Sequence, residues 1–230
     1  MTLTIEDLVI QIKHSSNRKT MQLTVDRDSS LLLTAPPTVT NEKLEGFVRS
    51  KLSWIYQKLA EKSLMQKAIR PKQFVQGEGF FYLGRSYRLN LVDEQTVPLK
   101  FHHGRFHLAG SNVCNARKLF IDWYSSKGVK WFTAKANEFK NRLGVEYSSV
   151  KVRDLGYRWG SCGKNQTLYF HWKTILLPAK IAEYVVVHEL SHLLEPNHSA
   201  EFWLSVERAM PDYKERKQWL AENGMDVEGL

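Results

Sequence analysis

The sequence has little cysteine and no long run of apolar residues. Its 230 residues include 2 cysteines, too few for the disulfide framework of a small secreted protein. No segment approaches the ~18–20 consecutive apolar residues of a membrane span. The first residues, MTLTIEDLVIQIKHSS, lack the basic start, apolar run and small-residue cleavage site of a secretory signal. These absences predict a cytoplasmic protein without a membrane partner.

Glycine and proline are also sparse, and the chain contains no internal repeat and no low-complexity segment. With 13 glycines and 7 prolines, the composition is not that of a fibrous or disordered protein. Hydrophobic residues make up 43% of the sequence and aromatic residues 12%. This is enough to bury one large core or two modest ones, so we expect a globular protein.

The net charge of +9 is spread unevenly along the chain. Residues 116–180 contain 13 Lys and Arg against 4 Asp and Glu, whereas residues 181–230 contain 4 against 10. A basic middle and an acidic end can fold into surfaces that compensate each other, or the basic part can form a cleft for an anionic ligand. The second alternative includes association with nucleic acid through a basic surface.

Hydrophobic patterning predicts an α+β fold with two regions. Residues 1–110 form an N-terminal β-rich region with one helix, which starts at an N-cap of Thr40 or Asn41 and carries an apolar stripe from Leu44 to Leu59. The strands expected in this region are 8–13, 21–25, 31–34, 80–83, 87–92, 99–101 and 105–108.

Residues 111–230 form the second region, which is either a separate domain or continuous with the first. The elements expected at its start are a helix over 116–143, with a candidate interruption at Gly128, and strands over 150–153 and 167–172. A further helix begins at Pro178. Val185, Val186 and Val187 favour a strand by propensity, but the polar residues after them have the spacing of one helix face, so we expect a helix here.

Residues 188–192 read His-Glu-Leu-Ser-His, an HExxH motif. On a helix, His188 and His192 lie one turn apart on a common face, so both imidazoles can reach one zinc ion. Glu189 is then placed to take a proton from a water that the metal activates. His198 follows six residues after His192, where a turn beyond the helix can return a third imidazole to the metal.

The spacing HExxHxxxxxH is that of the metzincins, which have glycine where this chain has Glu195. Without that glycine the segment Pro196-Asn197 must redirect the chain, and Asn197 is the residue that best tolerates a positive φ. Two alternatives stay open. In one, Glu201 or Glu207 is the third ligand; in the other, the three histidines have no metal role.

Several further segments accompany the motif: RWGSC at 158–162, FHW at 170–172, YVVVHELSH at 184–192, EPNHS at 195–199, FW at 202–203, RKTM at 18–21, APP at 35–37 and YLGR at 82–85. Together they resemble the YgjP-like family of predicted zinc metallopeptidases, which is akin to the WLM and SprT-type domains. The resemblance covers most of the chain. It implies that 111–230 is a zincin-like catalytic region with zinc ligands His188, His192 and His198 and with Glu189 as the general base.

The RWGSC segment has two interpretations. It is a purely architectural turn with Trp159 as a packing anchor, or it lies beside the metal, where Arg158 stabilises an oxyanion or holds a substrate carboxylate. Tyr157 is a competing donor for the oxyanion. Cys162 is either a reactive thiol or a small buried residue.

Other polar residues are candidates for supporting roles. Glu195 and Asn197 can orient a ligating imidazole, and His171 can do the same or simply pack on the sheet. A second histidine cluster, without an accompanying carboxylate or thiol, is a weak candidate for another metal site; it consists of His102, His103 and His107.

The sequence therefore predicts a zinc-dependent metallopeptidase that hydrolyses peptide bonds in a peptide or protein substrate. Two other functions remain as alternatives. One is a nucleic-acid-associated module with a structural zinc, and the other is a metal-dependent hydrolase of a non-peptide amide or ester.

Overall fold

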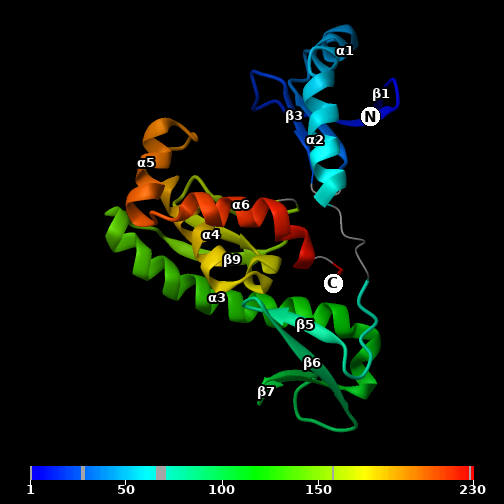
Figure 1. Ribbon diagram of the computed structural model, residues 1–230, viewed down its shortest axis with the longest axis vertical. Helices are drawn as coiled ribbons and strands as arrows, with labels where there is room; N and C mark the ends of the chain where they lie inside the picture. Colours follow the sequence, from blue (N-terminus) through cyan, green and yellow to red (C-terminus); the bar gives the residue numbers. More distant parts are fainter. Residues whose placement is uncertain (1, 27–28, 66–70, 157, 228) are drawn as a thin grey trace. The chain divides into compact units, whose positions relative to one another are not determined.

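The computed structural model describes residues 2–26, 29–65, 71–156, 158–227 and 229–230. It divides into two compact units, Met1–Ala68 and Ile69–Leu230 (Figure 1). Each unit contains strands, helices and its own buried hydrophobic cluster, which confirms the α+β class. None of the helices in the described ranges combines the length and the apolar character that crossing a membrane requires.

The first unit is a four-stranded sheet with two helices. Its elements are β1 (Thr2–Ile5), β2 (Leu8–His14), β3 (Gln22–Val25), β4 (Leu31–Ala35), α1 (Asn41–Arg49) and α2 (Leu52–Met65). The strand order is β1-β2-β4-β3, with β2 and β4 parallel and the other pairs antiparallel. Alternate residues of β2 and β4 are buried with Leu44, Val48 and Ile55 of the helices, so the predicted apolar stripe does cover the sheet.

The one helix predicted in this unit is two helices in the structure. The break comes at Ser50, whose hydroxyl donates to the carbonyl of Phe47 at 2.7 Å. A serine that bonds to a nearby carbonyl offers the chain an alternative to continuing the helix. Thr40 is the N-cap as expected, but its side chain makes no capping hydrogen bond.

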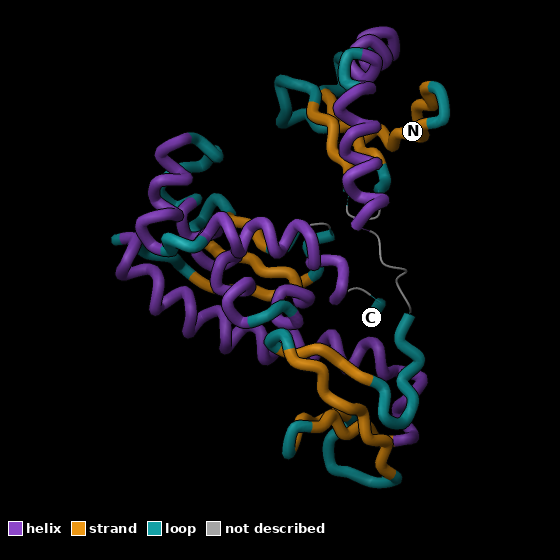
Figure 2. The backbone as a smooth tube through the Cα atoms, viewed as in Figure 1, coloured by secondary structure: helices purple, strands orange, loops and turns teal. Residues whose placement is uncertain are grey.

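The second unit contains two sheets and the remaining helices (Figure 2). Its elements are β5 (Gly79–Tyr82), β6 (Arg85–Val92), β7 (Leu99–His102), β8 (Arg105–Ala109), η1 (Gly110–Asn115), α3 (Ala116–Leu143), β9 (Ser149–Arg153), β10 (Gly160–Cys162), β11 (Thr167–His171), η2 (Trp172–Leu176), α4 (Ala179–Ser191), α5 (Ala200–Ala209), α6 (Tyr213–Asn223) and η3 (Gly224–Val227). The sheets have the orders β5-β6-β8-β7 and β10-β11-β9, so β10 is an edge strand.

The sheet β5–β8 belongs to the unit that carries the histidine motif. The Phe80 ring from β5 stacks on Phe120 of α3 with ring centroids 4.2 Å apart, and Phe106 of β8 is buried in the same cluster. The predicted N-terminal region of 1–110 includes these strands. The two compact units divide between residues 68 and 69, and the aromatic side chains of β5 and β8 pack on α3.

Helix α3 runs without interruption over 28 residues, so the predicted interruption at Gly128 is wrong. A Cβ atom at this position would lie 3.3 Å from side-chain carbons of Phe132 and Val152. The glycine therefore serves the close packing of α3 on β9. The helix ends at Gly144, which adopts the left-handed conformation (φ 66°) that glycine tolerates best.

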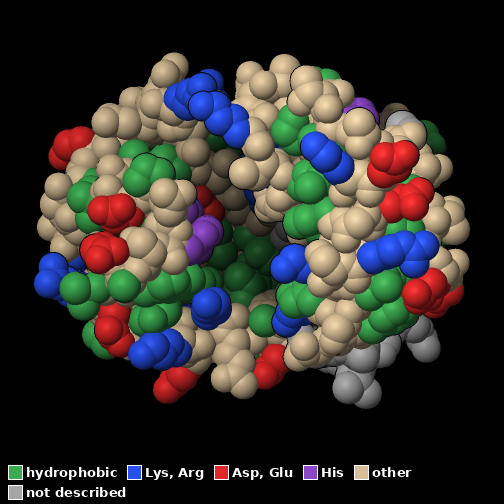
Figure 3. Space-filling model, turned by 90° about the horizontal axis from the view of Figure 1, so that it is seen from above, with side chains coloured by type: hydrophobic (Ala, Val, Ile, Leu, Met, Phe, Trp, Pro, Cys, Tyr) green, Lys and Arg blue, Asp and Glu red, His purple; other side chains and the backbone are tan. Residues whose placement is uncertain are grey.

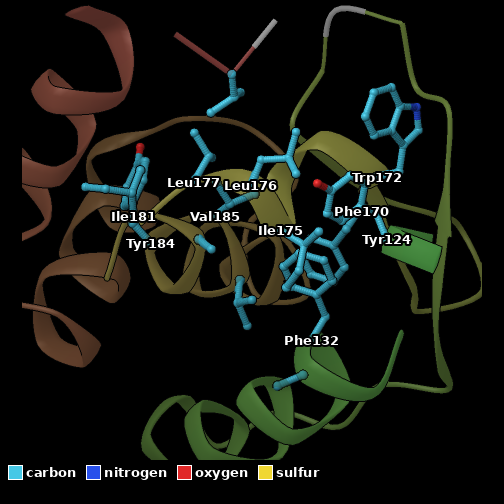
Figure 4. Packing of buried hydrophobic residues seen from close by; sticks show 14 of the residues in the cluster. Tyr124, Phe132, Phe170, Trp172, Ile175, Leu176, Leu177, Ile181, Tyr184 and Val185 are labelled. Carbon is cyan, nitrogen blue, oxygen red and sulfur yellow. The ribbon is translucent and has the colours of Figure 1, made fainter. Parts of the chain in front are cut away.

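Helix α4 lies at the centre of the second unit and contacts α3, α5, α6 and β10. Val185, Val186 and Val187 are all buried, as expected of a helix that is apolar on every side. Burial of these side chains outweighs their modest preference for strands. In the core beneath, the rings of Phe132 and Phe170 stack with centroids 4.3 Å apart (Figure 4).

Candidate metal centre

The end of helix α4 brings together the two histidines of the HExxH motif. His188 lies in the last turn, and His192 is the C-cap with helical angles (φ −66°, ψ −15°). Their ring centroids are 5.0 Å apart. The two imidazoles are thus neighbours on one helix face, as the i, i+4 spacing predicts.

His198 joins them from the segment between α4 and α5. Its Nε2 atom lies 3.0 Å from Nε2 of His188. One ring nitrogen of each of the three histidines lies within 4.8 Å of the other two. Across the described ranges, this is the one group of three or more His, Cys, Asp or Glu residues close enough to hold a metal ion.

The chain turns after His192 without a left-handed residue at Asn197. Asn197 best tolerates a positive φ but does not adopt one, since it is absent from the positive-φ residues of the described chain. Backbone N–H groups of Leu194 and Glu195 both donate to the carbonyl of Ser191 at 3.0 Å. These turn hydrogen bonds tighten the end of α4, which explains why no glycine is needed at position 195.

The protonation of these histidines suits metal binding. Nδ1 of His192 lies 3.1 Å from the carbonyl oxygen of Glu195; a carbonyl accepts only, so Nδ1 carries the proton and Nε2 is left as the ligand atom. Burial lowers the pKa of His188 to about 3, and burial also lowers the pKa of His198. Neutral imidazole is the form that binds a metal.

The distance between two of the nitrogens is close to the value expected at one tetrahedral ion. Two imidazole nitrogens bound to zinc lie about 3.3 Å apart when each Zn–N bond is about 2.0–2.1 Å. The 3.0 Å between Nε2 of His188 and Nε2 of His198 is close to this value. Nδ1 of His188 is buried with no hydrogen-bond partner among the described residues, so Nε2 is the ring nitrogen of His188 that faces another polar group.

Aromatic side chains of α5 surround the histidines. The Trp203 ring stacks on His198 with centroids 5.7 Å apart and an interplanar angle of 22°, and Phe202 lies 4.6 Å from the ring of His192. The ammonium of Lys217 sits 4.0 Å above the Trp203 ring. Figure 3 shows histidine side chains that reach the surface beside hydrophobic and acidic groups.

Glu189 lies on the side of α4 that meets β10. Its side chain is buried, and the backbone N–H of Cys162 donates a hydrogen bond to its carboxylate. Burial raises the pKa of Glu189 to about 8, against the opposing effect of the Arg158 charge and of that hydrogen bond. The carboxyl group is therefore held between the HExxH helix and the edge strand.

The RWGSC segment packs within the second unit through Trp159 and carries Arg158 close to Glu189. The exposed guanidinium of Arg158 donates to the Ser161 hydroxyl at 3.3 Å, and its charge acts on Glu189. Trp159 packs as an anchor: a Cβ atom on Gly224 would lie 2.9 Å from its ring. Tyr157, the competing donor, lies outside the described residues.

One supporting residue acts through its main chain, and His171 packs on the sheet, one of its two expected roles. Glu195 orients His192 through its backbone carbonyl. His171 is buried in the sheet, where its Nδ1 accepts from the Lys173 amide at 3.1 Å and its Nε2 lies 3.3 Å from Asp154. His171 thus anchors the segment before β10. Burial, followed by the charge of Glu189, raises the pKa of Cys162 and keeps it a thiol.

The remaining candidates lie away from the three histidines. Glu207 pairs with Lys214 at 3.4 Å, and Glu201 bonds with the Ser199 side chain at the start of α5. His102 and His103 contact each other with ring centroids 3.9 Å apart, whereas His107 bonds with Asn90. None of these residues belongs to a metal-competent group within the described ranges.

Several basic residues of the segment 116–180 form ion pairs with nearby acids. Lys135 of α3 lies 2.8 Å from Glu183 of α4, and ion pairs at 2.6 to 3.5 Å join Lys118 to Asp122, Lys140 to Glu146 and Arg142 to Glu138. On the face shown in Figure 3, acidic and basic side chains are interspersed. These pairs correspond to the compensating surfaces for this part of the segment.

Residues 19–223 match the family model described as the YgjP-like metallopeptidase domain. The chain belongs to the YgjP-like metallopeptidase family. Membership makes it a hydrolase of the peptidase class and implies a metal ion. A solved structure, the metallopeptidase zymogen of Pyrococcus abyssi abylysin, is 25% identical to this YgjP-like chain; the match covers 39% of this chain and 92% of that one, with a TM-score of 0.37. No curated protein matches the sequence.

The sequence of this YgjP-like protein does not predict the contact between Glu189 and strand β10. The glycines of the RWGSC region predict a turn, but Gly160 is the first residue of β10 and is not among the residues with positive φ. The sequence signal for this contact is a small residue in the RWGSC segment. Its neighbour across the fold lies 29 positions later in the chain, a distance that pattern reasoning cannot bridge.

Proposed function

We propose that this protein is a zinc-dependent metallopeptidase whose zinc is held by His188, His192 and His198. The observation that carries the proposal is the convergence of three imidazole nitrogens at the end of α4, the helix that also carries the buried Glu189. Three protein ligands leave a coordination position open, as in catalytic zinc sites, whereas structural zinc sites are closed by four. A zinc ion bound there would supply Lewis acidity that polarises a carbonyl group and makes water a stronger acid.

In this proposal Glu189 is the general base and then the general acid. The positive charge of a bound zinc would favour the ionised form of Glu189 over the form that burial favours. The carboxylate then accepts a proton from the attacking water and returns it to the leaving amine of the cleaved peptide. Arg158 stabilises the negative charge that develops on the carbonyl oxygen. Support for this role is that the guanidinium is exposed and near enough to Glu189 to affect its ionisation. The substrate is a peptide or protein.

The test combines metal analysis with peptide cleavage. We expect about one zinc per chain, retained in Glu189→Gln and lost in His192→Ala, because Gln removes the base without removing a ligand. Cleavage of a mixed peptide library should fall by about 100- to 10,000-fold in Glu189→Gln. Full activity in that variant would overturn the role of Glu189. A chain that stays metal-free after zinc is added back would overturn the metal site.

A panel of small amides and esters separates a peptidase from a hydrolase of another substrate. Activity on the panel with no cleavage in the peptide library would replace the proposed substrate class. We do not propose nucleic-acid binding, because only the composition of the basic segment favours it.

A further inference from the structure

Strand β10 approaches helix α4 through a residue without a side chain. A Cβ atom built on Gly160 would lie 2.6 Å from both Cγ and Oε1 of Glu189 and 2.9 Å from its Cδ. These distances are shorter than non-bonded carbon contacts allow. Glycine is not required here by the backbone, since Gly160 is not among the residues with positive φ. The space above Gly160 is filled by the Glu189 side chain, and this explains the glycine.

The main chain of β10 also points a donor at Glu189. The carbonyl of Trp159 accepts from His171 at 2.9 Å, and the N–H of Gly163 donates to Thr167 at 2.8 Å, so these residues bond toward β11. In an antiparallel pair alternate residues bond to the partner strand, so Gly160 and Cys162 direct their N–H and C=O groups to the opposite side. That side is the open edge of the sheet, and there the Cys162 N–H donates to the Glu189 carboxylate.

We propose that Gly160 and the Cys162 amide form a slot that positions the Glu189 carboxylate. The inference rests on the proposed function for its catalytic consequence, but the slot itself is a matter of packing. Because residue 160 has no side chain, the Glu189 carboxylate can approach the strand closely. The hydrogen bond from the Cys162 amide fixes the rotation of that carboxylate. Glu189 cannot withdraw to the other side, because α4 is packed against α3, α5 and α6.

The slot predicts a specific coupling between positions 160 and 189. In metal-free, full-length protein, Gly160→Ala should lower the melting temperature by about 5 °C, as expected for overpacking in a unit of this size. The same substitution in a Glu189→Ala background should have little effect, because the side chain that it would strike is gone. Tryptophan fluorescence is suitable, since Trp54 is the one tryptophan of the 7 outside the second unit.

Gly163→Ala is the matched control. Gly163 directly follows β10, also lacks a positive φ, and a Cβ atom there would lie 2.8 Å from the Tyr169 ring. Gly163→Ala should therefore destabilise the protein by the same amount in the natural chain and in the Glu189→Ala background. If Gly160→Ala is equally destabilising with and without the Glu189 side chain, or if both of its versions fail to fold, the slot does not exist.

The catalytic consequence is measured on a peptide that the natural enzyme cleaves. Gly160→Ala should retain zinc and KM while kcat falls by about 100-fold, because a displacement of about 1 Å at a catalytic group costs that much. Gly163→Ala should keep its kcat. Unchanged kcat in Gly160→Ala would overturn the positioning role. If the natural chain cleaves no peptide, the proposed function fails, and the melting experiment still decides whether the slot exists.

Discussion

The imidazole of His198 projects from the segment between two helices, so its position depends on contacts that its side chain makes. On one side it meets His188, and on the other it stacks on Trp203. Trp203 is itself held between His198 and Tyr213, whose ring stacks on it with centroids 5.5 Å apart. This column of rings restricts His198 to one orientation. A ligand that is already oriented loses less entropy when it binds a metal.

Removing the Trp203 ring should therefore weaken metal binding. We expect Trp203→Ala to lower zinc affinity by about 10- to 100-fold and Trp203→Phe to retain most of it, measured by competition with a chromophoric chelator. Trp54→Ala is the control, since Trp54 lies in the first unit. Equal affinities for Trp203→Ala and the natural chain would show that the stack does not orient the ligand.

Asp154 links stability to pH through the segment that precedes β10. The Gly156 amide, followed by the charges of His171 and Lys173, lowers the pKa of Asp154. A lowered pKa in the folded state stabilises the protein above the ordinary Asp range of about 3.9, and this contribution is lost as the pH falls through the lower, folded value.

Asp154→Asn should accordingly lose less stability between pH 5 and pH 2.5 than the natural chain does. At pH 7 the variant should be the less stable of the two, because the ionised carboxylate contributes there. Urea unfolding at several pH values measures the difference. Asp93→Asn, at an exposed carboxylate, is the comparison; the same pH response from both variants would rule out a particular role for Asp154.

At the scale of elements, the bounds of the long helices agree with the hydrophobic pattern. The effect of a single residue within a helix depends on the elements that pack against it. The predicted bounds of the helix over 116–143 are confirmed, because 28 residues of regular patterning average out single exceptions. Gly128 is such an exception. Its effect on a helix depends on whether another element packs against it, and β9 does so here.

A branched side chain at Gly128 should push α3 away from β9. We expect Gly128→Val to destabilise the protein by about 1–3 kcal/mol through overpacking, measured by urea unfolding. Ser126→Val places the same residue on an exposed part of the same helix and isolates the cost of β-branching. Similar losses for the two variants would mean that the contact with β9 is not tight.

At the scale of the whole molecule, the three histidines, Glu189 and Arg158 all lie in the second compact unit. The hydrophobic cluster of that unit contains no residue of the first. The family model nevertheless starts at residue 19, inside the first unit. All the residues needed for the proposed metal site thus lie in one unit, whereas the family match extends over both.

A fragment of residues 69–230 should therefore fold and bind about one zinc ion with the affinity of the full chain, since it keeps the complete core and all three histidines. Residues 1–68 should bind none. Circular dichroism and metal analysis of the two fragments test this. A fragment 69–230 that is unfolded or metal-free would show that the first unit is needed to form the site.

The sequence by itself determined the α+β class, the family resemblance and the three candidate ligands, because these depend on short-range periodicity and on spacing within one helix and the turn after it. The tertiary structure alone decided which strands pack with the motif, how the lysines are paired, and which residues surround Glu189. These features join segments that are far apart in the chain. Gly160 and Glu189 are an example: the need for glycine is created by a carboxylate from another element.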